Sequence, residues 1–184
     1  MIEMNSIGLV ELSSIAAGYE VADKMLKTSE VELLLMRSIC SGKFIVLVGG
    51  DVAAVRASVE SGEVAGFGCV VDSFVIPNVH KAIFPAIAGT VQVEALEALG
   101  IIESFSVASL IEAADAAVKA ARVQLIEIRL AMALGGKAFV SMTGEVAAVR
   151  AAVESGAAVC SQRGLLTNKV VIPNPKKELL KELI

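Results

Sequence analysis

The sequence contains very few of the residues on which most catalytic and metal centres depend. Its 184 residues include no tryptophan, one tyrosine, three cysteines and a single histidine, His80. One histidine leaves little material for a hydrolytic triad or a zinc site, and no general base stands beside a nucleophile. We therefore expect a protein that is not an enzyme.

Long apolar runs and basic clusters are also missing. No stretch reaches the roughly 18 uninterrupted apolar residues that cross a membrane, and residues 1–4 do not begin a secretory signal. The net charge of −4, without a basic cluster, argues against nucleic acid as a partner. Three scattered cysteines are too few for a disulfide scaffold, so we expect a reducing, cytoplasmic environment.

Apolar residues, by contrast, are abundant. Hydrophobic residues make up 55% of the chain, charged residues 20%, and the mean hydropathy is +0.73. Because no membrane span accounts for these values, the remaining explanation is a chain that buries additional surface against copies of itself. We expect a homo-oligomer.

The first half of the chain predicts elements in the order β-α-β-β-α-β. Strands are expected over residues 7–12, 31–39, 43–48 and 70–76, and helices from Ser13-Ser14 to about Thr28 and from Asp51 to about Ser61, the second closed by Gly62. This order is the split βαβ pattern of ferredoxin-like α/β (α+β) sandwiches.

The pattern then begins again. Gly100-Ile101-Ile102-Glu103 matches Gly8-Leu9-Val10-Glu11, and residues 146–156 match residues 52–62 with a single difference. Two copies of one domain, over residues 1–90 and 91–184, fit this spacing better than a solenoid of shorter repeats. Residues 79–99 are expected to connect them as a helix broken near Gly89, and residues 176–184 to form a C-terminal helix.

The two copies differ in the loop between their second and third strands. The first copy has Ile39-Cys40-Ser41-Gly42-Lys43, and the second has Met132-Ala133-Leu134-Gly135-Gly136-Lys137. One copy therefore carries a thiol where the other carries apolar residues and glycine.

A signature of glycines and charged residues occurs once in each copy. Its members are Gly8, Glu11, Asp23, Lys27, Gly42, Lys43, Gly50 and Asp51 in the first, and Gly100, Glu103, Asp115, Lys119, Gly136, Lys137, Gly144 and Glu145 in the second. This signature resembles that of bacterial microcompartment shell proteins, and its presence twice resembles their tandem, trimer-forming class. The resemblance implies a pseudohexameric trimer that joins other shell proteins, edge to edge, in the wall of a microcompartment.

A cysteine just before Gly-Lys in the first domain is similar to a subgroup of this class with an iron–sulfur cluster at the trimer centre. The resemblance implies a 4Fe-4S cluster held by Cys40 of each chain, with three thiolates on three irons and the fourth iron open. Such a site would suit electron transfer across the shell, with an encapsulated or cytosolic redox enzyme as a partner.

Two other functions remain open. The centre of the tile could be a metabolite pore without a cluster, lined by the small or apolar loop residues Ser38, Ser41, Gly42, Leu134 and Gly135. Alternatively, a trimer with the same fold could be a regulatory protein that binds an effector between subunits.

The remaining candidate residues have simpler roles. By the same resemblance, Lys27, Lys119, Asn78 and Asn174 are expected at the edge of the tile. Asp51 and Glu145 are expected to cap helices. Cys69 and Cys160 are expected to be buried, inert thiols.

Overall fold

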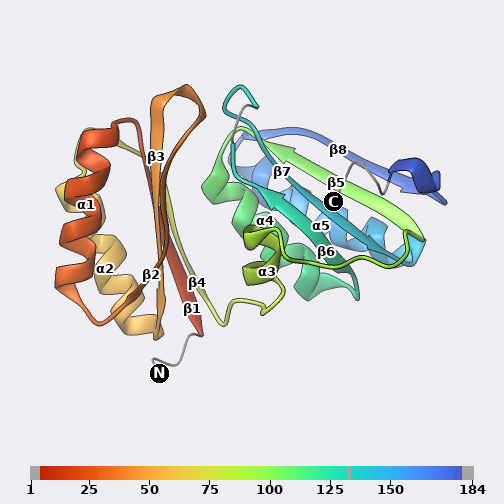
Figure 1. The fold of residues 1–184 in the computed structure, drawn as a ribbon, viewed down its shortest axis with the longest axis horizontal. Coiled ribbons are helices and arrows are strands. Elements are labelled where there is room, and N and C mark those ends of the chain that lie inside the picture. The colour runs from red at the N-terminus through yellow and green to blue at the C-terminus, as the bar shows by residue number, and fades with distance from the viewer. Residues whose placement is uncertain (1–4, 132–133, 180–184) are drawn as a thin grey trace. The chain divides into compact units, whose positions relative to one another are not determined.

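The computed structural model describes residues 5–131 and 134–179 and divides the chain into two compact units, Met1–Val79 and His80–Ile184 (Figure 1). In each unit two long helices cover one face of a four-stranded antiparallel sheet. The predicted α/β class and the predicted duplication are both confirmed.

The first unit has the predicted order of elements. They are β1 (Ser6–Leu12), α1 (Ile15–Thr28), β2 (Glu32–Ile39), the short 3₁₀ turn η1 (Cys40–Gly42), β3 (Lys43–Gly50), α2 (Val52–Ala65) and β4 (Val70–Pro77). The strands lie in the order β2-β3-β1-β4, which is the ferredoxin-like arrangement. β3 is buried from Phe44 onward, as its continuous apolar run predicts.

The second unit repeats this arrangement. Its elements are α3 (Ile83–Ala88), β5 (Ala98–Ser104), α4 (Val107–Ala120), β6 (Gln124–Arg129), β7 (Ala138–Gly144), α5 (Val146–Gln162), β8 (Leu166–Pro173) and the 3₁₀ turn η2 (Lys177–Leu179). The strand order β6-β7-β5-β8 is that of the first unit. No helix within the described residues is long and apolar enough to span a membrane.

Local capping chemistry explains where α1, α2 and α4 begin, whereas α3 and α5 have no side-chain cap. The Ser14 side chain accepts a hydrogen bond from the Ala17 N–H, and the Asp51 carboxylate accepts from the N–H groups of Ala53 and Ala54. The prediction that Glu145 caps α5 is wrong in part, because Glu145 holds the N-cap position but its side chain makes no capping hydrogen bond.

Gly62 does not end a helix, contrary to the sequence prediction. α2 continues to Ala65, and Gly66 is its C-cap. A Cβ atom on Gly62 would lie 2.8 Å from the Cγ and Sδ atoms of Met25, so this glycine allows α1 and α2 to approach closely. Tertiary packing, not helix termination, accounts for it.

The segment between the domains is helical only in part. α3 ends at Gly89, whose φ of 65° makes it a left-handed C-cap, and residues 90–96 have no regular secondary structure. α3 packs on β6 and α4, so the boundary between the compact units falls at Val79 and His80, earlier than the expected division at residues 90 and 91. Of the expected C-terminal helix, the structure has the η2 turn, and residues 180–184 lie outside the described residues.

Candidate functional site

Cys40 lies at the tip of the β2–β3 hairpin. It opens the η1 turn, between the buried Ile39 and the exposed Ser41 and Gly42, and is itself half-buried. Ser41 and Gly42 both have left-handed backbone conformations, with φ values of 66° and 71°. Two successive left-handed residues reverse the chain sharply, and this reversal sets the thiol at the end of the hairpin.

An ion pair fixes the base of this hairpin. Lys43, the first residue of β3, pairs with Glu11 of β1, whose side chain is completely buried while that of Lys43 is 15% exposed. The pair can form because β1 lies beside β3 with Leu12 opposite Phe44. The signature contains both residues, but their contact depends on the strand order, and sequence reasoning did not find it.

The second unit repeats the ion pair but not the thiol. Lys137 pairs with Glu103 at 2.8 Å, and the two side chains are 37% and 30% exposed. Gly135 and Gly136 supply the left-handed turn there, with φ values of 61° and 86°, and Leu134 is half-buried. Met132 and Ala133 of the predicted loop lie outside the described residues.

The other two cysteines have different surroundings. Cys160 is fully buried on α5, with its Sγ atom 3.6 Å from the Ser109 carbonyl oxygen, and desolvation by burial raises the pKa of its thiol. Its predicted burial is confirmed. Cys69 is only half-buried, so the prediction of burial is wrong there, because it lies in the turn that follows α2. No disulfide joins any of the three.

The fit of a 4Fe-4S cluster rests on the donor chemistry at the hairpin tip. Within the described part of one chain, no group of three or more His, Cys, Asp or Glu side chains could hold a metal ion. Cys40 is a soft thiol donor, partly exposed at a turn, of the type that iron–sulfur clusters require. One chain could therefore supply one ligand, and three chains could supply three.

The expected edge residues occupy equivalent places in the two units. Lys27 pairs with Asp23 at 2.7 Å across one exposed turn of α1, and Lys119 pairs with Asp115 on α4. Asp115 is buried and also accepts a hydrogen bond from the His80 N–H. Lys119 is thus tethered more firmly than Lys27.

Asn78 and Asn174 each follow the proline that ends a strand, β4 or β8. Both are exposed and left-handed, with φ values of 52° and 47°. Asparagine tolerates this conformation better than most residues, which accounts for its presence in both copies.

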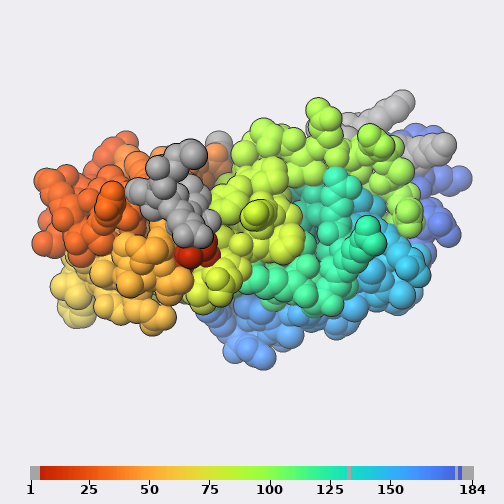
Figure 2. All heavy atoms as spheres, turned by 90° about the horizontal axis from the view of Figure 1, so that it is seen from below, coloured from red at the N-terminus to blue at the C-terminus, as the bar shows by residue number. Residues whose placement is uncertain are grey.

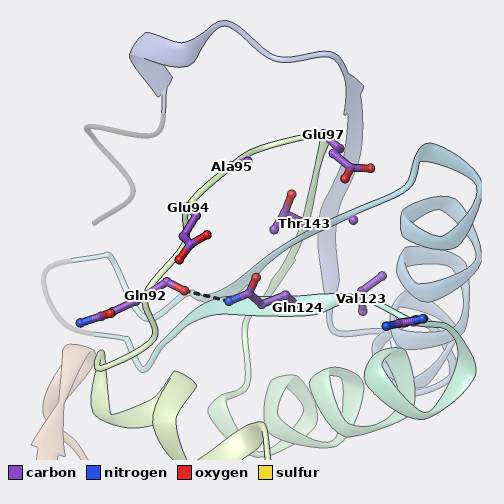
Figure 3. Close-up of a pocket in the computed structure, with 9 residues that line it drawn as sticks. Gln92, Glu94, Ala95, Glu97, Val123, Gln124 and Thr143 are labelled. Carbon is purple, nitrogen blue, oxygen red and sulfur yellow. Dashed lines mark hydrogen bonds between the residues drawn. The ribbon is translucent and has the colours of Figure 1, made fainter.

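A pocket in the second unit was not predicted. Its volume is about 550 Å³, and residues 92–97 of the connector form one wall against the ends of β6 and β7 (Figure 3). The lining residues are Gln92, Glu94, Ala95, Glu97, Arg122, Val123, Gln124, Thr143 and Gly144. The sequence does hold one signal, since Thr143 replaces Gly49 of the first copy.

The comparisons with known proteins agree with this duplicated fold. The BMC domain matches residues 6–79 and again residues 98–175. The chain therefore belongs to the BMC-domain family of bacterial microcompartment shell proteins, and it carries the domain twice.

Particular relatives cover one copy or both. The chain is 41% identical to the bacterial microcompartment shell protein PduT of Citrobacter freundii over 97% of each protein. It is 50% identical to a microcompartment protein of Desulfitobacterium hafniense of known crystal structure, with a TM-score of 0.89 and coverage of 97% and 99%. The shell protein EutM of Escherichia coli is 44% identical, but matches 46% of this chain and 84% of its own length.

Proposed function

We propose that this protein forms trimeric tiles in a microcompartment wall, with a 4Fe-4S cluster held by Cys40 of each chain. The main support is the position of Cys40, a half-buried thiol at the tip of a hairpin whose counterpart in the second unit has no cysteine. A threefold axis multiplies one such ligand to three. When bound, the cluster would supply one-electron transfer.

The exposed apolar surface of the first unit supports assembly into a trimer. On α1, Ile15 is 45% exposed and Tyr19 is 59% exposed, although the corresponding residues of α4, Val107 and Ile111, are fully buried. Figure 2 shows that both helices of the first unit lie at its surface. Phe67, 92% exposed, extends this apolar surface at the turn that packs beside the start of α1. Another chain is the simplest cover for it.

A groove in the second unit could receive such a surface. It has a volume of about 320 Å³ and lies on the face of the sheet opposite α4 and α5. Ile101, Phe139 and Val170 provide its apolar lining, while Glu103 provides charge at its margin. In the proposed trimer, the α1 face of one chain covers the groove of the next. Six domains then surround the axis.

The proposed edges are outside this apolar surface. Lys27 and Asn78 of the first unit, and Lys119 and Asn174 of the second, are exposed polar residues at helix or strand ends. Such residues suit contacts between tiles, which must form without burying large apolar areas. Their contacts would join the trimer to other shell proteins in the compartment wall.

The cluster is tested by anaerobic purification, an absorption spectrum, and iron and sulfide counts per trimer. The wild-type protein is expected to be brown, and Cys40→Ser to be colourless but still trimeric. Cys69→Ser and Cys160→Ser are matched controls that should keep the colour. Wild-type protein that stays colourless and iron-free after anaerobic reconstitution would end the cluster proposal and leave the trimeric tile unaffected.

A metabolite pore is the second candidate. Ser38, Ser41 and Gly42 are exposed on the same hairpin, and Gly135 is exposed on its counterpart, so polar groups are available to a passing solute. Crystals soaked with candidate metabolites would show density on the threefold axis in that case. A regulatory trimer would instead remain as discrete particles on overexpression, without the sheets or tubes that electron microscopy shows for tiles.

A further inference from the structure

We infer that the pocket between the connector and the ends of β6 and β7 binds a small zwitterion of the amino-acid class. No residue of this pocket belongs to the hairpin of Cys40 or to the proposed tile edge. The inference therefore does not depend on the cluster proposal. The pocket of about 550 Å³ is of the size that small-molecule sites have, about 300–1,000 Å³.

The connector is held in place as a wall by apolar and polar anchors. Val93 packs with Leu99 and Ile126 in a buried cluster, against which Val91 and Leu96 also pack. The pocket-lining residues Gln92, Glu94 and Ala95 between these anchors are exposed. The Gln124 side chain donates a hydrogen bond of 2.8 Å to the Gln92 carbonyl oxygen (Figure 3). These anchors leave the wall in place without a ligand, so the site is largely preformed.

Thr143 is the observation that points to a ligand. The residue is 4% exposed and lines the pocket, yet its Oγ1 atom has no hydrogen-bond partner among the described residues. Figure 3 shows this side chain rising from β7 toward the connector that carries Glu94 and Glu97. A buried hydroxyl without a partner is unfavourable, and a polar ligand in the pocket would supply one.

The charges around the pocket indicate which ligand groups it would take. The Glu94 and Glu97 carboxylates can accept from an ammonium group, and the Arg122 guanidinium can donate to a carboxylate in a bidentate manner. A metal ion fits less well, because the described residues hold no group of three metal-ligating side chains. A molecule with both an ammonium and a carboxylate group would satisfy both signs of charge and the Thr143 hydroxyl.

The first unit shows that this pocket is not a by-product of the fold. The paired residues Gln124 and Thr143 of the second sheet correspond to Glu32 and Gly49 of the first. Arg122 corresponds to Glu30 at the matching end of the preceding helix. The first unit thus lacks both the hydroxyl and the cation, so three such pockets are expected in each trimer.

The test uses ligand-observed saturation-transfer NMR on the full-length assembled protein, with L-alanine and L-serine as probes at millimolar concentration. Propionate, which lacks the ammonium group, and ethylamine, which lacks the carboxylate, are the matched probes. Saturation transfer is expected for both amino acids. Each truncated probe is expected to bind at least about tenfold more weakly than the amino acids do. If neither L-alanine nor L-serine shows saturation transfer, the inference is overturned.

Variants locate the binding. Thr143→Val keeps the shape of the side chain and is expected to weaken binding about fivefold, whereas Glu97→Gln and Arg122→Gln are each expected to weaken it about tenfold. Glu30→Gln and Glu32→Gln, at the matching end of the first unit, are controls that should leave binding unchanged. Binding that survives all three pocket variants would place the ligand elsewhere and also overturn the inference. Unchanged trimer size in gel filtration confirms that the variants fold.

Discussion

The two units fill the same space under their first long helix, α1 or α4, with opposite residues. In the first unit the helix has Gly18 and the facing strand has Phe44, and a Cβ on Gly18 would lie 2.2 Å from the Phe44 ring. At the equivalent positions the second unit has Leu110 on α4 and Ala138 on β7, both fully buried. A large residue on the strand in one copy is thus replaced by a large residue on the helix in the other.

This exchange explains how the copies diverged without a change of fold. Interiors tolerate substitutions that conserve total volume, whereas a single large-to-small or small-to-large change leaves a cavity or an overlap. The ion pairs diverged differently, since the Lys43–Glu11 pair is buried and the Lys137–Glu103 pair is partly exposed. The same signature therefore has different energetic consequences in the two units.

Substitutions at Gly18 and Phe44 should have the largest effect on the free energy of unfolding. Phe44→Ala alone leaves a cavity and should lower the free energy of unfolding by about 3–5 kcal/mol. Gly18→Leu alone overlaps the Phe44 ring and should cost about 3 kcal/mol or more. The double variant has the pair of residues found in the second unit, and should be more stable than either single variant. Chemical denaturation of all four proteins measures this coupling. If the double variant loses as much stability as the two single variants together, the helix and strand positions do not compensate for each other, and the comparison between the units fails.

The ion pairs give the next largest effect. Glu11→Gln leaves the mostly buried Lys43 ammonium without its carboxylate and should cost about 3 kcal/mol, near the lower limit for a broken buried pair. Glu103→Gln, its matched control, should cost less than about 1 kcal/mol, because solvent screens the Lys137–Glu103 pair. Thermal unfolding of the two variants measures the difference. Equal shifts in Tm would mean that burial of Glu11 has no energetic consequence.

Loss of this pair should also disturb the hairpin that carries Cys40. Lys43 directly follows the η1 turn, so its anchorage to β1 limits the movement of the thiol. If the cluster proposal is right, Glu11→Gln should hold less iron per trimer than Glu103→Gln after the same anaerobic reconstitution. Iron content that is equal in the two variants would show that the turn itself, with its two left-handed residues, positions the thiol.

The parts of the fold that follow from local rules could be predicted from the sequence. The strand and helix order and the Ser14 and Asp51 caps depend on residues that are close in sequence, and the duplication follows from matching the two halves of the chain. Gly62 was misinterpreted because the helix-ending role of glycine is a local rule, whereas here the glycine faces Met25 of another helix. The Glu11–Lys43 contact and the pocket at Thr143 depend on which strands and segments are neighbours in the folded protein. Local sequence patterns do not predict these neighbours. Cys40 was found because the copies could be compared.

Replacement of a glycine by alanine within α2 or α5 should have a smaller effect on stability, and one that differs between the two helices. A Cβ on Gly156 of α5 would lie 2.6 Å from the Ala113 carbonyl oxygen of α4, which cannot move easily. A Cβ on Gly62 would meet side-chain atoms instead, the Cγ and Sδ atoms of Met25 at 2.8 Å, and a side chain can shift more easily than a backbone carbonyl. Alanine also favours a helix over glycine by about 1 kcal/mol. We therefore expect Gly156→Ala to destabilise by about 2 kcal/mol and Gly62→Ala to be close to neutral, as measured by urea denaturation. A Gly62→Ala cost as large as that of Gly156→Ala would indicate that Met25 is held rigidly.

The smallest expected effect concerns the two cysteines outside the hairpin. Burial raises the pKa of Cys160 above its reference value of 9.0, so the folded protein keeps this proton at a pH where the unfolded chain releases it. Stability should therefore fall as the pH rises above about 9, and this part of the fall, below about 1 kcal/mol, should vanish in Cys160→Ala. Cys69→Ala is the control that should retain it, because this variant leaves Cys160 in place. The difference in Tm between variant and wild type, followed from neutral to alkaline pH, measures the effect. A difference that does not change with pH would show that the folded protein binds no more protons at Cys160 than the unfolded chain does.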